Sequence, residues 1–193
     1  TRNGCTASDD VVITNDSYPA VVGADRFVCT NSATVTAQPI NPNSGASGLW
    51  SVQTGSGTFA NPTSFSTAIT GLSLGDNRLR WTVSKGACSS FDEIVISNKA
   101  ITTSAGTDET TCDNFFTLNA TPLNANEVGT WSSGGLGIQF VSPNSPSTLV
   151  NFLNQGLNTF AWFVRDTITN CTATSTVRVT SNFFKPYAGP DMD

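Results

Sequence analysis

The stretch NRLRWTV, residues 77–83, decides the fold of this chain. In it, apolar and polar residues alternate: Leu79, Trp81 and Val83 against Arg78, Arg80 and Thr82. A period of two is typical of a β-strand with one face buried and the other in water. The stretch therefore predicts a strand at the edge of a hydrophobic core, with the Trp81 ring inside.

The same pattern returns further along the chain. Residues 158–164 read NTFAWFV and place Phe160, Trp162 and Val164 on the inward face. Matching residues 81 positions apart are Trp50 and Trp131, Phe59 and Phe140, Pro62 and Pro143, Leu72 and Leu153, Gly75 and Gly156, and Trp81 and Trp162. Matching residues 83 positions apart are Cys5, Cys88 and Cys171, then Cys29 and Cys112, and then Asp25, Asp108 and Asp191. Spacing this regular predicts a tandem repeat of about 83 residues.

The repeat divides the chain into four pieces. Residues 21–102 and 103–187 form two complete repeats. Residues 1–20 match the end of a repeat, because NGCTASDDVVITN is similar to GACSSFDEIVISN, and residues 188–193 match the start of one. We therefore expect two domains in an array that continues in both directions.

Composition favours an all-β fold. Short β-branched segments such as ATVTAQP, STAITGL and FDEIVISN alternate with Gly, Pro, Asn and Ser clusters, which are typical of strands and turns. A hydrophobic content of 38% and a mean hydropathy of -0.08 indicate a folded chain. We predict tandem immunoglobulin-like β-sandwich repeats, with Trp50, Trp81, Trp131 and Trp162 in their cores. Exposed Trp rings can also bind sugars, but the fixed places of these four in alternating strands favour the core.

Charge excludes one class of partner. The net charge is -5, the pI is near 4.5, and the nine Lys and Arg residues are scattered. Nucleic-acid binding depends on clustered cations, so we expect no nucleic-acid partner. No run approaches the roughly 18 apolar residues of a membrane-spanning helix, so we expect no membrane insertion of this segment.

Five cysteines and no histidine predict disulfides and an oxidising compartment, because a zinc site would need close pairs such as CxxC. Two pairings are equally regular. One joins Cys29 to Cys88 and Cys112 to Cys171, with the same separation in both bonds, and leaves Cys5 unpaired in this fragment. The other joins Cys5 to Cys29 and Cys88 to Cys112, again with one shared but shorter separation.

We favour the first pairing because each repeat could then fold alone. A geometric objection stands against it. In an ordinary seven-strand sandwich the turns that carry Cys29 and Cys88 lie at opposite ends, beyond the limit of about 7 Å between the Cα atoms of a disulfide.

The motifs as a set resemble a known family. The stretches GADRFVC, GLWSVQTGSGTFANPTSFSTAITGLSLGDNRLRW and CSSFDEIVISN are similar to the PKD-like or Ig-like repeats of very large cell-surface proteins in gliding Bacteroidota. The resemblance implies an adhesin of gliding motility, exported by type IX secretion to the extracellular face of the outer membrane. Its partners would be neighbouring repeats, the motility or secretion machinery of the outer membrane, and a substratum or polysaccharide.

Catalysis is not expected. Without histidine there is no Ser-His-Asp or Cys-His arrangement, and the acidic residues sit mostly in predicted turns. We predict that the chain is not an enzyme.

Acidic residues recur near the junctions between repeats: Asp9, Asp10, Asp25, Asp92, Glu93 and Asp108. Oxygen ligands gathered at a junction are what Ca²⁺ requires, so calcium is the one cofactor we consider. Solvated turn carboxylates are the favoured alternative, because Ser175 and Thr176 replace Asp92 and Glu93 in the last copy.

A modification site is a further candidate. Asp166, Thr167 and Ile168 form a D-T-I triplet that resembles the O-glycosylation signal of the same phylum. The resemblance makes Thr167 the glycan acceptor.

The leading function is a stalk or adhesive array, because repeats without a catalytic constellation supply length and a presented surface. The alternative is a carbohydrate-binding module of a secreted enzyme or surface protein. In that alternative Phe183, Phe184 and Tyr187 would stack on sugars.

Overall fold

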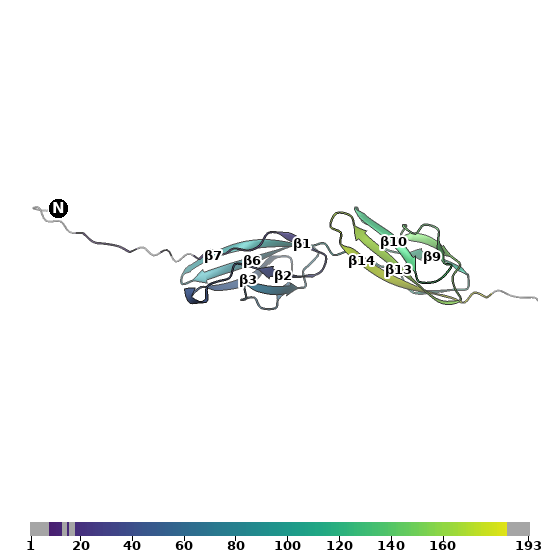
Figure 1. Cartoon of the computed structure of the whole chain (residues 1–193), viewed down its shortest axis with the longest axis horizontal. Helices are drawn as coiled ribbons and strands as arrows, with labels where there is room; N and C mark the ends of the chain where they lie inside the picture. Colours follow the sequence, from purple (N-terminus) through teal and green to yellow (C-terminus); the bar gives the residue numbers. More distant parts are fainter. Residues whose placement is uncertain (1–7, 13–14, 16–17, 185–193) are drawn as a thin grey trace, which may run out of the picture. The chain divides into compact units, whose positions relative to one another are not determined.

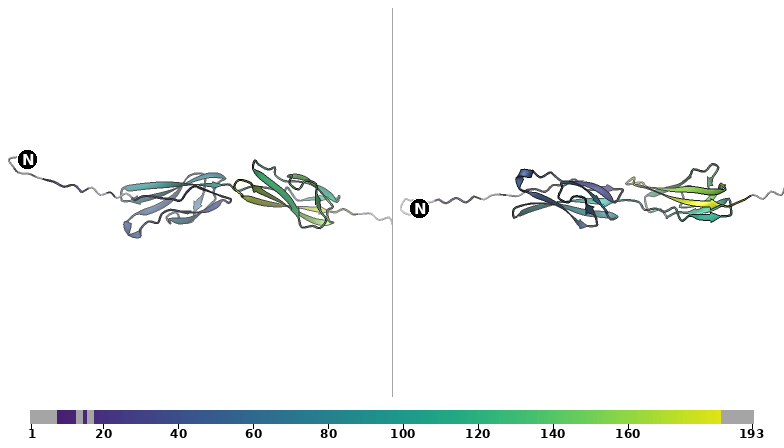
Figure 2. Two further views of the ribbon diagram at one scale, coloured as in Figure 1. Left: turned by 45° about the horizontal axis from the view of Figure 1, so that its top comes forward. Right: turned by 90° about the horizontal axis from the view of Figure 1, so that it is seen from below.

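The computed structural model describes residues 8–12, 15 and 18–184. It divides into two compact units, unit 1 within Thr1–Asn98 and unit 2 within Lys99–Asp193. Each unit consists of two facing β-sheets (Figures 1 and 2). The predicted piece 188–193, with Asp191, lies outside the described residues, as do Cys5 and Tyr187.

Unit 1 pairs a four-stranded with a three-stranded sheet. The larger sheet has the order β1 (Arg26–Val28), β7 (Cys88–Asn98), β6 (Gly75–Lys85), β3 (Ser47–Thr54). The smaller has the order β2 (Ser32–Thr36), β5 (Ser66–Thr70), β4 (Thr58–Phe59). A short 3-10 helix, Pro42–Ser44, lies between β2 and β3. All pairings are antiparallel except that of β1, which runs parallel to β7.

Unit 2 has the same strand order. Its larger sheet is β8 (Glu109–Thr111), β14 (Thr172–Ser181), β13 (Gly156–Asp166), β10 (Glu127–Ser133). Its smaller sheet is β9 (Phe115–Asn119), β12 (Ser147–Asn151), β11 (Gln139–Phe140). Again only the first strand, β8, is parallel to the last, β14. The predicted all-β immunoglobulin-like sandwich is therefore the fold of this chain.

Alternating residues of both sheets form the two cores. Trp50 and Trp81 lie opposite each other on β3 and β6, with ring centroids 5.2 Å apart. Trp131 and Trp162 are paired in the same way on β10 and β13, at 5.0 Å. All four rings are at most 4% exposed. The period of two in the sequence thus places each Trp pair at the centre of a core.

Each Trp pair depends on a glycine in the edge strand. A Cβ atom at Gly48 would lie 2.0 Å from the Trp81 ring, and one at Gly129 would lie 2.2 Å from the Trp162 ring. A side chain at either position would therefore overlap the indole. The glycines let the ring edge lie directly beneath the backbone of β3 or β10.

A buried asparagine fixes the turn before β6. Asn77 is fully buried, and its Oδ1 accepts hydrogen bonds from the amides of Ser56 and Ser73 and from the Ser73 hydroxyl. Its Nδ2 donates to the carbonyl oxygens of Ser73, Gly75 and Ile96. The whole side chain is thus used to hold the loop that leads into the strand.

The corresponding residue of unit 2 is Asn158. Its Oδ1 accepts from the Asn154 amide, and its Nδ2 donates to the carbonyl oxygens of Asn154, Gly156 and Val179. The same turn is therefore held by a smaller set of hydrogen bonds.

Unit 1 has an upstream end, where β7 begins at Cys88, and a downstream end, where β7 stops at Asn98. The segment before β1 runs along β7 from one end toward the other. The amides of Ala20 and Val22 donate to Ser90 Oγ and Asp92 Oδ2, at 3.0 and 2.9 Å. β1 then continues in the same direction opposite Ile96 to Asn98.

Candidate functional site

The outer face of the larger sheet of unit 1 carries an ion-pair cluster. Glu93 Oε2 lies 3.0 Å from Arg78 Nη1, and Glu93 Oε1 lies 2.7 Å from Arg80 Nη2. The Arg80 guanidinium also lies 3.9 Å from the centroid of the Phe91 ring. Hydrogen bonds from Arg80 and then Arg78 hold the pKa of the Glu93 carboxyl below its ordinary value of 4.5. One carboxylate therefore pairs with both guanidinium groups of this cluster.

The acidic residues considered for calcium do not come together in the structure. Asp25 Oδ1 accepts the Val95 amide at 2.8 Å, and Asp108 Oδ1 accepts the Arg178 amide at 2.8 Å. Asp92 accepts the amides of Val22 and Glu93. These carboxylates hold the first segment of each unit to its last strand.

The other acidic candidates are used differently. Glu93 pairs with two arginines, and Asp9 and Asp10 are exposed in the segment before β1. Within residues 8–12, 15 and 18–184, no three Asp, Glu or Cys side chains are close enough together to hold a metal ion. The described residues thus offer no calcium cluster of the kind considered from the sequence.

The pairing of the cysteines differs from the one we favoured. Cys29 and Cys171 are disulfide-bonded, whereas Cys88 and Cys112 are free and exposed. Neither Cys29 with Cys88 nor Cys112 with Cys171 is therefore formed, and the alternative bond of Cys88 with Cys112 is not formed either.

Strand register explains why the favoured bonds fail. Cys29 follows Val28, which lies opposite Asn98, while Cys88 lies opposite Lys85 at the other end of the sheet. Ten steps along β7 at about 3.3 Å each put the two cysteines roughly 30 Å apart. Cys112 and Cys171 lie at opposite ends of β14 in the same way. The geometric objection raised by the sequence is correct.

The D-T-I triplet forms a tight turn after β13. Asp166 Oδ1 accepts the amides of Ile168 and Thr169 and the Thr169 hydroxyl. The two bonds from Thr169, followed by the one from Ile168, hold the pKa of Asp166 below its ordinary value of 3.8. Thr167 is exposed, and its hydroxyl donates to the Asn126 carbonyl at 2.9 Å. Its position at an exposed turn is compatible with a glycan acceptor.

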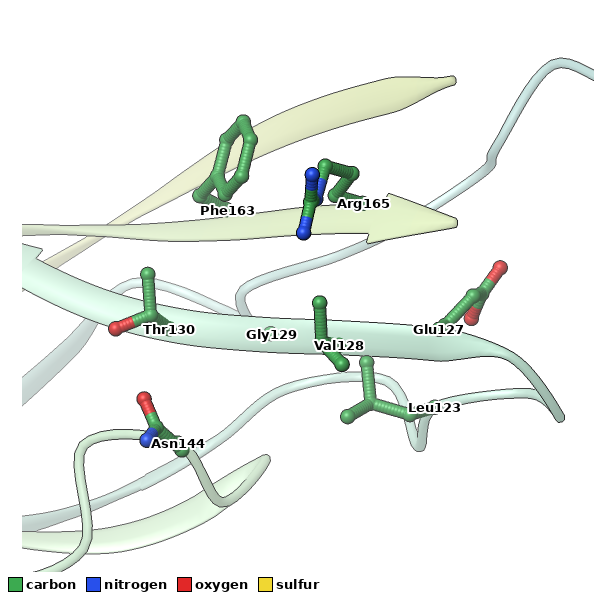
Figure 3. Close-up of a pocket in the computed structure, with 8 residues that line it drawn as sticks. All are labelled: Leu123, Glu127, Val128, Gly129, Thr130, Asn144, Phe163 and Arg165. Atoms are coloured by element: carbon green, nitrogen blue, oxygen red, sulfur yellow. The ribbon is translucent and has the colours of Figure 1, made fainter. Parts of the chain in front are cut away.

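Unit 2 carries a groove of about 420 Å³ along its edge strand β10 (Figure 3). Its walls come from β10, β13 and two loops: Leu123, Glu127, Val128, Gly129, Thr130, Asn144, Phe163 and Arg165. Phe163 lies opposite Thr130, and Arg165 opposite Val128. Phe163 is 37% exposed, and Arg165 and Asn144 are exposed. An aromatic ring, a guanidinium and an amide thus share one open groove.

Unit 1 has a smaller groove at the corresponding place, of about 290 Å³. Subtracting the 81-residue offset, five lining residues of unit 2 correspond to lining residues of unit 1: Pro42, Ala46, Ser47, Gly48 and Thr63. The counterparts of Phe163 and Arg165 are Thr82 and Ser84. The backbone groove is therefore shared. Unit 1 lines it with Phe65 and Trp81 and with no cationic side chain, whereas unit 2 lines it with Phe163 and the Arg165 guanidinium.

The two described aromatic residues proposed for sugar stacking lie after β14. Phe184 is 79% exposed, and Phe183 is partly buried. Neither lines the groove in unit 2. No helix in the described part of the chain has the length and apolarity needed to cross a membrane.

Neither a family model nor a curated protein sequence matches this chain. Among solved structures it is similar to the PKD domain from the KIAA 1837 protein, with 25% identity, 50% of this chain and 98% of that chain covered, and a TM-score of 0.38.

Two bacterial structures are similar at lower identity. The fibronectin(III)-like modules of Clostridium thermocellum CbhA match with 11% identity, 89% and 100% coverage, and a TM-score of 0.33. A SusE-like surface-located polysaccharide-binding protein from the Bacteroides thetaiotaomicron heparin utilisation locus matches with 9% identity, 85% and 34% coverage, and a TM-score of 0.37. The strand order of each unit defines the class, an immunoglobulin-like β-sandwich.

Proposed function

We propose that this chain is a non-catalytic repeat segment of a large bacterial cell-surface adhesin, acting as a stalk or adhesive array in gliding motility and surface attachment. The observation that carries the proposal is the repetition itself. Two units with one strand order follow each other in a sequence whose cysteines and aspartates recur at one constant spacing. Arrays of this kind supply length and a presented surface.

The chemistry of the described residues supports a non-catalytic role. The sequence contains no histidine, and the carboxylates near the ends of the units are engaged by backbone amides or arginines. A general acid or base needs a proton-accepting group free to meet a substrate. We therefore assign these carboxylates a structural role.

The identity of the parent is part of the proposal. The sequence motifs resemble the repeat region of the gliding-motility adhesin SprB. By that resemblance the parent would pass through type IX secretion and remain at the outer-membrane surface, in contact with neighbouring repeats and the motility machinery.

Antibodies raised against the 193-residue chain provide the test. They should label intact, unpermeabilised cells of the producing bacterium, and brief treatment with an external protease should remove the label. Monovalent Fab fragments should slow gliding on glass. Labelling that appears only after permeabilisation would contradict the proposal, and normal gliding of Fab-coated cells would remove its motility part.

A further inference from the structure

We propose that the groove of unit 2 binds an anionic polysaccharide, with Phe163 stacking on a sugar ring and Arg165 pairing with its carboxylate or sulfate. This inference deepens the proposed adhesive role by naming a ligand class. It does not depend on gliding, since a groove in a secreted module of any kind would bind in the same way.

The first support is the state of the Arg165 guanidinium. The salt bridges among the described residues are those of Arg78 and Arg80 with Glu93, so Arg165 is in none. Its one hydrogen bond to a side chain is a long one, 3.4 Å, to Asn170 Oδ1. Figure 3 shows the guanidinium turned toward Phe163. A positive charge is therefore available beside an exposed aromatic ring.

The Glu127 carboxylate, which also lines the groove, does not form an ion pair with Arg165. Glu127 Oε2 accepts the Asn124 amide at 2.8 Å, and Glu127 Oε1 accepts Asn124 Nδ2 at 3.3 Å. Glu127 is thereby held to the loop at one end of the groove, away from Phe163 (Figure 3). Arginine suits the remaining role because its fork of N–H groups matches the oxygens of a carboxylate or sulfate.

The second support is the arrangement of the groove for a saccharide. The apolar face of a pyranose ring can pack on Phe163, while Asn144 and Thr130 offer donors and acceptors to hydroxyl groups. Four consecutive residues of β10, Glu127 to Thr130, line the groove, so it follows the strand.

A peptide that adds a strand to the sheet is a poorer occupant. Strand addition needs the outward backbone groups of β10. The Trp131 amide already donates to the Pro143 carbonyl at 2.7 Å, and the Glu127 amide donates to Asn124 at 3.1 Å. The free part of this edge between them is too short for a β-ladder.

The third support is the comparison with unit 1. Thr82 and Ser84 stand where unit 2 has Phe163 and Arg165, and Ala46 and Thr63 stand where it has Glu127 and Asn144. Strands with Thr and Ser at these two outward positions fold into the same sheet. Folding alone therefore does not require Phe163 or Arg165.

The test is affinity electrophoresis of the 193-residue chain through gels that contain alginate, dextran sulfate or neutral dextran. We expect retardation by alginate or dextran sulfate, and the two gels distinguish a carboxylate ligand from a sulfate ligand. The variants Phe163→Thr and Arg165→Ser introduce the residues of unit 1. Each should weaken binding about ten-fold, the first by removing the stacking contact and the second by removing the charge-assisted contact. Arg178→Gln removes the same charge from the same sheet outside the groove and should leave binding unchanged.

Three results would overturn the proposal. They are no retardation by either anionic polysaccharide, an equal loss of binding in Arg178→Gln, and equal binding of polyglutamate, which would indicate attraction to any polyanion. Thermal melts of the variants establish that the exposed substitutions leave unit 2 folded. A chain that fails this test can still form a stalk, so the surface-labelling experiment stands separately.

Discussion

The outer face of the larger sheet carries arginines paired with a carboxylate in unit 1 and, within the described part of the chain, an arginine outside any salt bridge in unit 2. In unit 1, Glu93 joins Arg78 and Arg80, and Arg80 covers Phe91. In unit 2 the counterparts of Arg80, Phe91 and Glu93 are Ala161, Thr174 and Thr176, while Arg165 has no carboxylate partner among the described residues. The inward residues remain apolar in both units, although their sizes change, as from Leu79 to Phe160 and from Ile96 to Val179. The same backbone fold thus presents different surfaces in the two units, because outward residues can change while the core stays apolar.

The largest effect expected is one in which the units behave alike. Trp81→Ala and Trp162→Ala each remove a fully buried indole and should destabilise their own unit by about 3–5 kcal/mol. Hydrogen exchange measured by mass spectrometry, with peptides from β6 and β13, separates the two units. Loss of protection in both units from either substitution would show that they unfold together.

Replacing the buried asparagines should destabilise the two units to different extents. Asn77→Ala removes the side chain that bonds three donors and three acceptors of unit 1, whereas Asn158→Ala affects fewer groups. We expect a loss of about 3 kcal/mol in unit 1 and about 1 kcal/mol in unit 2. Urea denaturation followed by exchange in each unit measures both. Equal losses would mean that water replaces the missing hydrogen bonds.

Replacing the edge-strand glycines should destabilise the two units to the same extent. Gly48→Ala and Gly129→Ala place a methyl group against a Trp ring and should each cost about 2 kcal/mol. Gly23→Ala and Gly134→Ala are matched controls, because a Cβ there meets nothing within 4 Å. Thermal melts of the four variants decide the point, and a neutral Gly129→Ala would show that unit 2 can move its Trp ring.

Acid should distinguish the units weakly. The pKa of Glu93 is lowered in the folded chain, so its contribution to stability is present above about pH 4.5 and is lost as the pH falls through the lowered value. Glu93→Gln should flatten the acid side of the stability profile of unit 1 only. Unit 2 should keep its own acid sensitivity, since the pKa of Asp166 is lowered too. The effect is small because the cluster is exposed to solvent.

Calcium should produce the smallest effect. Asp25, Asp92 and Asp108 already accept backbone amides, so we expect superimposable thermal melts in calcium and in EDTA. A higher melting temperature in calcium would indicate a bound ion near the junction. Asp9 and Asp10 would then be the first residues to substitute.

The sequence predicts the strands well because alternation is local. Trp81 and Trp162 face the core because their neighbours two residues away do so as well. The favoured disulfides are not formed. A constant repeat spacing makes any pairing of equivalent cysteines look equally regular, so it does not show which cysteines lie close together. The expected strand order of a sandwich already placed Cys29 and Cys88 at opposite ends, and the parallel pairing of β1 with β7 confirms it.

Predicting the groove requires both the strand pattern in the sequence and the positions of the loops in the structure. Phe163 and Arg165 are outward residues of a predictable strand, and the change from Thr82 and Ser84 is visible in the sequence. That Asn144 and Leu123 complete the walls follows from loops whose paths no local pattern specifies.

The parallel pairing of the first and last strands also determines how a unit responds when its two ends are pulled. The chain enters unit 1 along the start of β7 and leaves from the end of β7, so tension slides β1 and β7 past each other lengthwise. Their hydrogen bonds, with those of Ala20, Val22 and Asp25, are then loaded in shear and must break together. A hairpin pulled open at one end would lose its bonds singly. β8 and β14 repeat this geometry. In each unit, hydrogen bonds loaded in shear therefore resist extension before the core is exposed.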